Sequence, residues 1–202
     1  MHFQTAKNGF YVVVEGVDTC GKSTQIKNLK ALYPNAIFTK EPGGSSIGEC
    51  VRKMLLDSTN LQPLSEFFLF LADRNQHYCE VLQPNLALNK LIISDRSFIS
   101  GLAYMREMSV KEALEFNFIA LQGLKPNASI LLEMSEEDLR TRLSQKPNDR
   151  IEQRGIPYML ETQSKMLHFL QLLEIPTLRL QASLPQEHIT QEIARFIQTH
   201  QS

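Results

Sequence analysis

Short apolar runs alternate along the chain with longer stretches in which apolar residues recur at helical spacing. The candidate strands are the runs 10–16, 36–39, 91–95, 128–133 and 176–180. Consecutive runs are separated by segments long enough to form a helix, as the crossovers between parallel strands require. The apolar letters VVV, LII and ILL are continuous rather than alternating, which indicates strands that are covered on both faces. The pattern therefore predicts an α/β fold, with a five-stranded parallel sheet and helices on both faces in a doubly wound three-layer sandwich.

Composition narrows the class of protein. The 202 residues are 43% hydrophobic, enough for one buried core, so we expect a single domain over residues 1–202. The chain has 21 Lys+Arg against 22 Asp+Glu, so no overall charge attracts nucleic acid or an anionic membrane. Cys20, Cys50 and Cys79 lack the spacing of zinc ligands or of a disulfide framework. No stretch approaches the eighteen apolar residues of a membrane span, and we expect a cytoplasmic protein.

Residues 15–25, EGVDTCGKSTQ, contain a phosphate-binding motif. Gly16, Gly21, Lys22 and Ser23 fit the pattern G-x(4)-G-K-[ST], between a strand-like run and the helix-like run 22–33. Glycines let backbone N–H groups converge on phosphate oxygens at the start of a helix. We expect Lys22 to reach the β- and γ-phosphates and the Ser23 hydroxyl to ligate Mg²⁺. The predicted ATP-binding residues are Gly16, Val17, Asp18, Thr19, Cys20, Gly21, Lys22, Ser23 and Thr24, with Arg140 further along the chain.

A phosphate loop is found in kinases, GTPases and several classes of ATPase. The base-reading NKxD motif of GTPases is absent from the sequence, since Asn89-Lys90 is followed by Leu91-Ile92. The glycine-rich signature of transporter ATPases is absent as well. A chain of this length has room for one nucleotide site and one acceptor site.

Two segments provide candidate residues for an acceptor. Asp95 and Arg96 directly follow a buried strand, where a carboxylate can meet Mg²⁺ and an arginine can hold a phosphoryl group, although a structural ion pair would give the same pattern. Phe70 and Arg74 lie four residues apart in the helix-like stretch 65–84 and therefore share one helix face. An aromatic ring can stack on a base, although core packing is the alternative for Phe70. Because a guanidinium only donates hydrogen bonds, Arg74 favours the O4 oxygen of thymine or uracil over the amino group of cytosine.

The sequence resembles the bacterial thymidylate kinases, which phosphorylate dTMP to dTDP with ATP and Mg²⁺. The resemblance lies in motifs that occur in order along the chain: EGVDTCGKSTQ, KEPGG, VRKMLLD, LFLADR, DRS with SGLAY, and DRIEQ. It implies that the chain is a P-loop kinase, that its partners are ATP and dTMP, and that it forms a homodimer.

The resemblance also implies roles for individual residues. Asp18 would bind the sugar 3′-hydroxyl, Tyr104 would exclude a ribose 2′-hydroxyl, and Pro42 would pack beside the base methyl group. Arg52 and Arg96 would hold the dTMP phosphate. The implied dTMP-binding residues are Asp18, Glu41, Pro42, Arg52, Phe70, Arg74, Arg96, Ser100, Gly101 and Tyr104. The implied catalytic residues are Lys22, Asp95, Arg96, Arg142 and Arg150, and the implied metal ligands are Ser23, Glu41 and Asp95.

This chain departs from the family pattern at Thr19, where some relatives carry an arginine, and at Ser97, where an aromatic residue or histidine is common. Other relatives place arginines in a mobile lid, which we expect here at about residues 142–150. The segment 139–155 supplies Arg140, Arg142, Lys146, Arg150 and Arg154, so the chain resembles the lid-arginine type. A deoxynucleoside kinase and a non-enzymatic nucleotide-dependent switch are the alternative functions.

Overall fold

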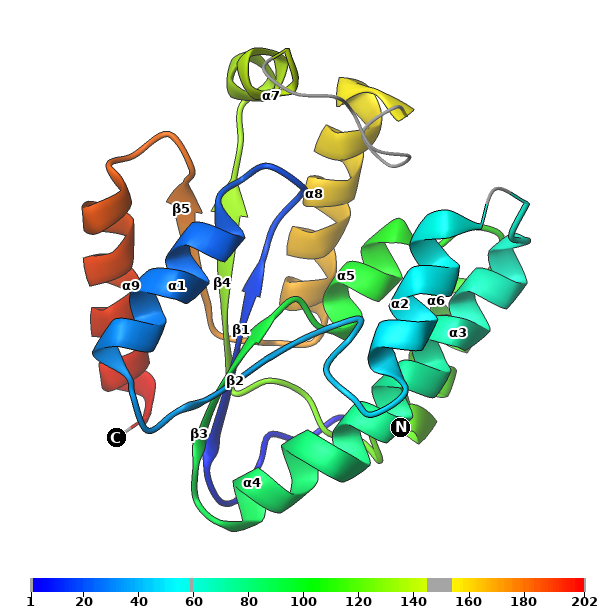
Figure 1. The fold of residues 1–202 in the computed structure, drawn as a ribbon, viewed down its shortest axis with the longest axis horizontal. Helices are drawn as coiled ribbons and strands as arrows, with labels where there is room; N and C mark the ends of the chain where they lie inside the picture. Colours follow the sequence, from blue (N-terminus) through cyan, green and yellow to red (C-terminus); the bar gives the residue numbers. More distant parts are fainter. Residues whose placement is uncertain (1, 59, 145–153, 202) are drawn as a thin grey trace.

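A computed structural model describes residues 2–58, 60–144 and 154–201 of the protein. Strands and helices alternate along most of the chain (Figure 1). In order, the elements are β1 (Phe10–Glu15), α1 (Lys22–Leu32), β2 (Ile37–Lys40), α2 (Gly48–Asp57), α3 (Pro63–His77), the π-helical turn η1 (Tyr78–Leu82), α4 (Gln83–Ala87), β3 (Leu91–Asp95), α5 (Phe98–Tyr104), α6 (Val110–Ala120), β4 (Ala128–Glu133), α7 (Glu136–Leu143), α8 (Ile156–Leu172), β5 (Thr177–Gln181) and α9 (Gln186–Gln201).

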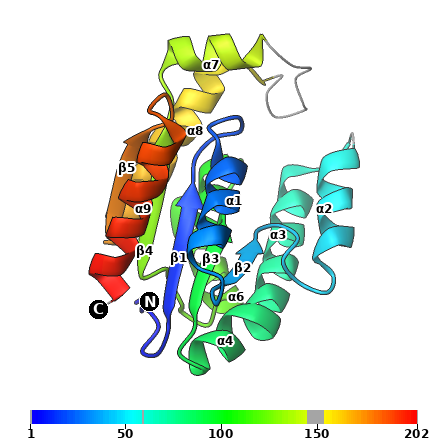
Figure 2. The ribbon, with the colours of Figure 1, turned by 60° about the vertical axis from the view of Figure 1, so that its left-hand side comes forward.

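The strands form one parallel five-stranded sheet in the order β2-β3-β1-β4-β5. Side chains of β1 alternate between two buried cores: Tyr11 and Val13 belong to one, and Val12 and Val14 to the other. Helices α1 and α9 cover the second core, whereas α3, α4, α5, α6 and α8 contribute to the first (Figure 2). This parallel sheet with helices on both faces confirms the predicted fold class. Burial on both faces explains why the strand sequences are largely apolar.

The sequence placed most elements to within a residue or two. The runs 91–95 and 128–133 coincide with β3 and β4, β1 ends one residue earlier than predicted, and β2 and β5 are each shifted by one residue toward the C-terminus. The predicted helix 65–84 begins earlier, at Pro63, and continues through η1 into α4. Within the described residues, no helix combines the length and the apolar character needed to cross a membrane.

The candidate site residues follow the carboxyl ends of the three neighbouring strands β1, β2 and β3. Backbone hydrogen bonds hold these ends together: Arg96 N donates to Val14 O at 3.0 Å, and Glu41 N donates to Asp95 O at 3.0 Å. Ligands of open parallel sheets bind at this edge.

Candidate active site

The phosphate loop between β1 and α1 has the backbone that its glycines predict. Gly16 has φ of 147°, and a Cβ atom there would lie 2.6 Å from Cys20 Sγ and 2.7 Å from Leu132 O, so no other residue fits. Cys20 fills space in this buried turn. Lys22 Nζ lies inside the loop and donates to the carbonyl oxygens of Gly16 at 3.0 Å and Val17 at 2.9 Å. A fixed ammonium therefore lies at the start of α1.

A polar cavity of about 300 Å³ opens over this loop. The residues that line it come from the loop and from the ends of β2 and β3, with Arg52 from α2: Asp18, Thr19, Gly21, Lys22, Ser23, Thr24, Lys40, Glu41, Arg52, Asp95 and Arg96. Cations outnumber carboxylates among them, as a site for phosphate groups requires.

The oxygens in this cavity suit a hard divalent cation such as Mg²⁺. Asp95 Oδ1 is buried and has no hydrogen-bond partner among the described residues. A buried carboxylate oxygen without a partner is unfavourable unless a cation or water satisfies it. Ser23 lines the same cavity. No cluster of three or more His, Cys, Asp or Glu occurs in the described part of the chain, so a cation here would take further ligands from phosphate and water.

A second cavity, of about 360 Å³, adjoins the first. Its lining is more apolar and includes all the residues of the predicted dTMP-binding set, Asp18, Glu41, Pro42, Arg52, Phe70, Arg74, Arg96, Ser100, Gly101 and Tyr104. Leu55, Glu66 and Ser97 line it as well. Four of these residues, Asp18, Glu41, Arg52 and Arg96, also line the cavity over the phosphate loop. The two cavities therefore meet at a shared wall of two carboxylates and two arginines.

Arg96 lies in this shared wall and is bound to the phosphate loop. Its Nη2 pairs with Asp18 Oδ1, and its Nη1 donates to Gly16 O at 3.0 Å and to Ser100 Oγ at 2.9 Å. Burial alone would lower the pKa of Arg96, but Asp18 raises it above its ordinary value. Tyr104 covers the guanidinium, with its ring centre 5.5 Å from the arginine Cζ, and burial raises the pKa of this tyrosine. Arg96 is therefore a permanent, well-oriented cation.

Glu15, at the end of β1, was missed by the sequence analysis. Its carboxylate is fully buried and accepts hydrogen bonds from Ser97 Oγ at 2.6 Å and from Ser100 Oγ. Burial raises the pKa of Glu15, while the bonds from the two hydroxyl groups oppose that shift. Ser97 also caps α5, since its Oγ accepts from Ile99 N at 3.2 Å. This serine, a departure from the family pattern, thus connects the start of α5 to β1.

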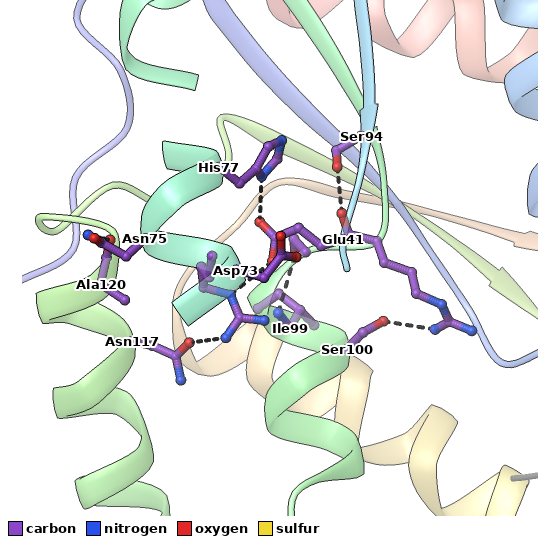
Figure 3. A network of polar contacts seen from close by, with 12 residues as sticks. Glu41, Asp73, Asn75, His77, Ser94, Ile99, Ser100, Asn117 and Ala120 are labelled. Atoms are coloured by element: carbon purple, nitrogen blue, oxygen red, sulfur yellow. Dashed lines mark hydrogen bonds and ion pairs between the residues drawn. The ribbon is translucent and has the colours of Figure 1, made fainter. Parts of the chain in front are cut away.

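Glu41, at the end of β2, is part of a second buried network (Figure 3). Its Oε2 accepts from Arg74 Nε at 2.9 Å, and its Oε1 is 3.1 Å from His77 Nδ1. The other ring nitrogen of His77 lies 2.6 Å from Thr39 Oγ1. Burial alone would raise the pKa of Glu41, but the charge of Arg74 and the bond with His77 hold it below its ordinary value. Both carboxylate oxygens are thus engaged within the protein.

Helix α3 also holds the loop that follows Glu41. Asp73 Oδ2 accepts from Gly43 N at 3.0 Å, and Asp73 Oδ1 accepts from Ser45 Oγ at 2.6 Å. Arg52 Nη1 donates to Pro42 O at 3.1 Å. Asp73 and His77 follow the apolar first half of the helix, and this change to polar residues was the only sequence signal for them.

The cations predicted for the lid differ in their contacts. Arg142 Nη1 donates to Thr19 O at 2.6 Å, and its Nη2 donates to Ala182 O at 2.8 Å. Arg140 is exposed and pairs with Glu136, one turn earlier in α7. Arg154 packs on Tyr158. Lys146, Arg150 and the predicted lid from residue 145 onward lie outside the described residues.

A phosphate loop joined to a second, partly apolar cavity through shared arginines defines a P-loop phosphotransferase. The family model described as "Thymidylate kinase" matches residues 14–193. Over 93% of this chain, the protein is 46% identical to the thymidylate kinase of Aliarcobacter butzleri, covering 98% of that protein, and 45% identical to that of Helicobacter hepaticus, covering 97%. The chain belongs to the thymidylate kinase family, and the predicted activity, phosphorylation of dTMP to dTDP with ATP as donor, is confirmed.

A solved structure shows the same fold at much lower sequence identity. The thymidylate kinase of Ehrlichia chaffeensis superposes with a TM-score of 0.75 at 20% identity, covering 94% of this chain and 99% of that one.

Proposed function

We propose that the γ-phosphoryl group of ATP passes in line to the phosphate of dTMP where the two cavities meet. The observation that carries this proposal is their shared wall, because Asp18, Glu41, Arg52 and Arg96 line both cavities. Phosphoryl transfer needs donor and acceptor to be aligned and the charge on the phosphoryl oxygens to be neutralised. A monophosphate acceptor already has a nucleophilic oxygen, so the proposal includes no general base and no covalent intermediate.

On the donor side, the amides of residues 16–24 and the ammonium of Lys22 hold the ATP phosphates. Ser23 and Asp95 would hold Mg²⁺, which when bound screens the negative charge of the phosphate groups. The buried Asp95 Oδ1, without a partner among the described residues, supports this assignment. Glu41 is a weaker candidate ligand, because both of its oxygens are bound by Arg74 and His77. We therefore assign Glu41 to the positioning of Arg74.

On the acceptor side, Arg52 and Arg96 hold the dTMP phosphate. Asp18 accepts a hydrogen bond from the 3′-hydroxyl, and Tyr104 occupies the space that a 2′-hydroxyl would need. The Tyr104 hydroxyl lies 3.5 Å from Asp18 Oδ2, which supports a common role at the sugar. Both residues also contact Arg96, so sugar and phosphate are oriented together.

The base lies between Phe70, which stacks on it, and Pro42, which packs beside its methyl group. Arg74 donates to O4, and Gly101 leaves room for the guanidinium. Ser100 donates to Glu15 and accepts from Arg96, so we assign it to the positioning of Arg96 rather than to a direct contact with the base.

We assign the chain to the lid-arginine type of the family. Thr19 leaves the phosphate loop without an arginine beside Asp18, so the cation that neutralises the transferring phosphoryl must come from elsewhere. Arg142 supports this assignment, because it is bound to Thr19 O and thus lies at the edge of the loop. A role in catalysis for Arg150 stays a prediction from the sequence, as does a role in ATP binding for Arg140.

A homodimer fits an exposed apolar surface on α3 and α6. This α3–α6 face consists of Leu64, Phe68, Phe116 and Ile119, which are between 39% and 68% exposed. The rings of Phe68 and Phe116 meet edge to face at 5.9 Å. A large exposed apolar patch is unusual on a monomer. We propose that a second copy covers this face and that residues 1–202 of each copy form a single P-loop kinase domain. A cytoplasmic location stays a prediction from the sequence.

An assay that couples ADP release to NADH oxidation tests the proposed mechanism. With ATP and Mg²⁺, dTMP should be a good acceptor and thymidine a poor one, because the two arginines of the shared wall have no phosphate to hold on thymidine. Arg52→Ala should raise the KM for dTMP more than the KM for ATP. Faster turnover of thymidine than of dTMP would contradict the proposal.

A further inference from the structure

Arg74 lies at the acceptor cavity with only 2% of its surface exposed, so neighbouring residues rather than water set its orientation. Its Nε donates to Glu41 Oε2 at 2.9 Å, and its Nη1 donates to Asn117 Oδ1 at 2.7 Å. A guanidinium is planar and carries five N–H donors at fixed angles. Bonds on two different nitrogens therefore fix the plane and the direction of the third nitrogen, Nη2.

That third nitrogen lies beside Gly101 in the cavity wall. A Cβ atom on Gly101 would lie 2.8 Å from Nη2 and 3.4 Å from Nη1. Gly101 and Arg74 both line the acceptor cavity. Glu41 binds Nε and Asn117 binds Nη1, so the edge of the Arg74 guanidinium that is available to a base is the one that carries Nη2.

The structure also fixes which end of the Asn117 amide meets Arg74. Asn117 is fully buried in α6, and its Nδ2 donates to Ala113 O, one turn earlier, at 2.7 Å. Because the amino group is bound to a carbonyl, the oxygen must be the atom that is turned to Arg74 (Figure 3). The reverse orientation would place an N–H donor against a guanidinium. Ala113 thus orients Asn117, and Asn117 orients Arg74.

We propose that Asn117 is a positioning residue for base recognition and acts through Arg74 without touching the nucleotide. The inference rests on the proposed function, in which Arg74 donates to O4 of thymine. With Nε and Nη1 held by acceptors, the remaining donors face an oxygen on the base. Cytosine presents an amino donor at the same position, and a guanidinium that cannot turn away meets it donor to donor.

Asn75 provides a matched control. It is the neighbour of Arg74 in α3, and its Nδ2 donates to Ala120 O in α6 at 2.9 Å. It therefore links the same two helices through an asparagine side chain (Figure 3), and among the described residues it makes no hydrogen bond to the Arg74 guanidinium. A loss of helix packing should appear in variants of either asparagine, whereas a loss of base recognition should appear only in variants of Asn117.

The test measures kcat and KM for dTMP, for dCMP and for a dTMP analogue that lacks the O4 oxygen. The variants are Asn117→Leu, Asn117→Ala, Asn117→Asp and Asn75→Leu, each checked for its melting temperature. Asn117→Leu fills the space and Asn117→Ala empties it, so either variant tests the proposal if the other fails to fold. Both should raise the KM for dTMP about tenfold, the effect of one hydrogen bond to a charged group, with a smaller change in kcat. Removal of O4 should weaken binding to wild type but not to these variants.

Asn117→Asp keeps an oxygen toward Arg74 and should retain the preference for dTMP, and Asn75→Leu should retain it as well. If both Asn117→Leu and Asn117→Ala keep the wild-type KM and O4 dependence, or if Asn75→Leu loses the preference equally, Asn117 is only structural. If wild type itself is indifferent to O4, the role of Arg74 in the proposed function is wrong and the inference falls with it. If wild type depends on O4 and the Asn117 variants do so equally, the inference alone is wrong.

Discussion

Replacing Glu41 by glutamine should destabilise the protein strongly, because this carboxylate is the centre of a buried charged network. Glu41, Arg74 and His77 are 4%, 2% and 0% exposed. A glutamine keeps one acceptor oxygen for Arg74 but has no negative charge, so it leaves the buried charge of Arg74 unpaired. Breaking a buried ion pair by removing one partner costs about 3 kcal/mol or more. For a chain of this size, 3 kcal/mol corresponds to a fall of roughly 6–12 °C in melting temperature.

The pH dependence of stability gives a second measure of the same interaction. The pKa of Glu41 in the folded protein lies below its ordinary value of 4.5. Below pH 4.5 the unfolded chain therefore binds more protons at this position than the folded protein does. The stabilisation by Glu41 is present above that pH and is lost as the pH falls through the lowered pKa. The Glu41→Gln variant should show a shallower loss of stability in this acid window.

Urea titration followed by circular dichroism, repeated at several pH values, measures both effects. Glu49→Gln is the control, because Glu49 is an exposed carboxylate that pairs with Lys40 at 2.6 Å and whose pKa is also lowered. Its loss should change the urea midpoint far less than the loss of Glu41. If Glu41→Gln unfolded at the wild-type urea concentration at neutral pH, the buried network around Glu41 would not stabilise the fold.

The remaining predictions concern the metal, the lid and the dimer. Asp95→Asn should lower kcat at least about 100-fold and weaken the Mg²⁺ dependence of activity without lowering the melting temperature, because the buried Oδ1 has no partner among the described residues to lose. Arg142→Ala should raise the KM for ATP or lower kcat, because it removes the cation that is bound to Thr19 O at the edge of the phosphate loop. Phe116→Glu in the α3–α6 face should produce monomers in analytical ultracentrifugation, and Leu88→Glu, at an exposed apolar residue outside that face, should not.

The sequence predicted the features that depend on contiguous residues. Strands buried on both faces must be apolar throughout, so β1, β3 and β4 were visible as runs. The phosphate loop was visible because converging amides and the following helix require glycines, lysine and serine at fixed spacing. Asp95 and Arg96 were visible because they directly follow a strand.

The polar networks behind the cavities could not be predicted in the same way. Glu41, His77 and Asn117 come from three separate segments and meet only when α3 and α6 pack beside the sheet. Glu41 lies in the KEPGG motif, but the motif does not show that its carboxylate pairs with Arg74 and His77. His77 and Asn117 are common residue types in unremarkable surroundings, and Asn117 lies among apolar residues of α6. Glu15 precedes the recognised motif by one position and could be a solvated carboxylate at a strand end. Only its burial beneath Ser97 and Ser100 shows that it supports the site.

In the proposed mechanism, ATP and dTMP meet in the joined cavities and the phosphoryl group passes directly between them. The most direct test uses ATP made chiral at its γ-phosphorus with oxygen isotopes, followed by stereochemical analysis of the dTDP formed. A single in-line transfer inverts the configuration at phosphorus, so we expect inversion. Retention would require two successive transfers through a phosphorylated side chain, and it would rule out direct transfer from ATP to dTMP.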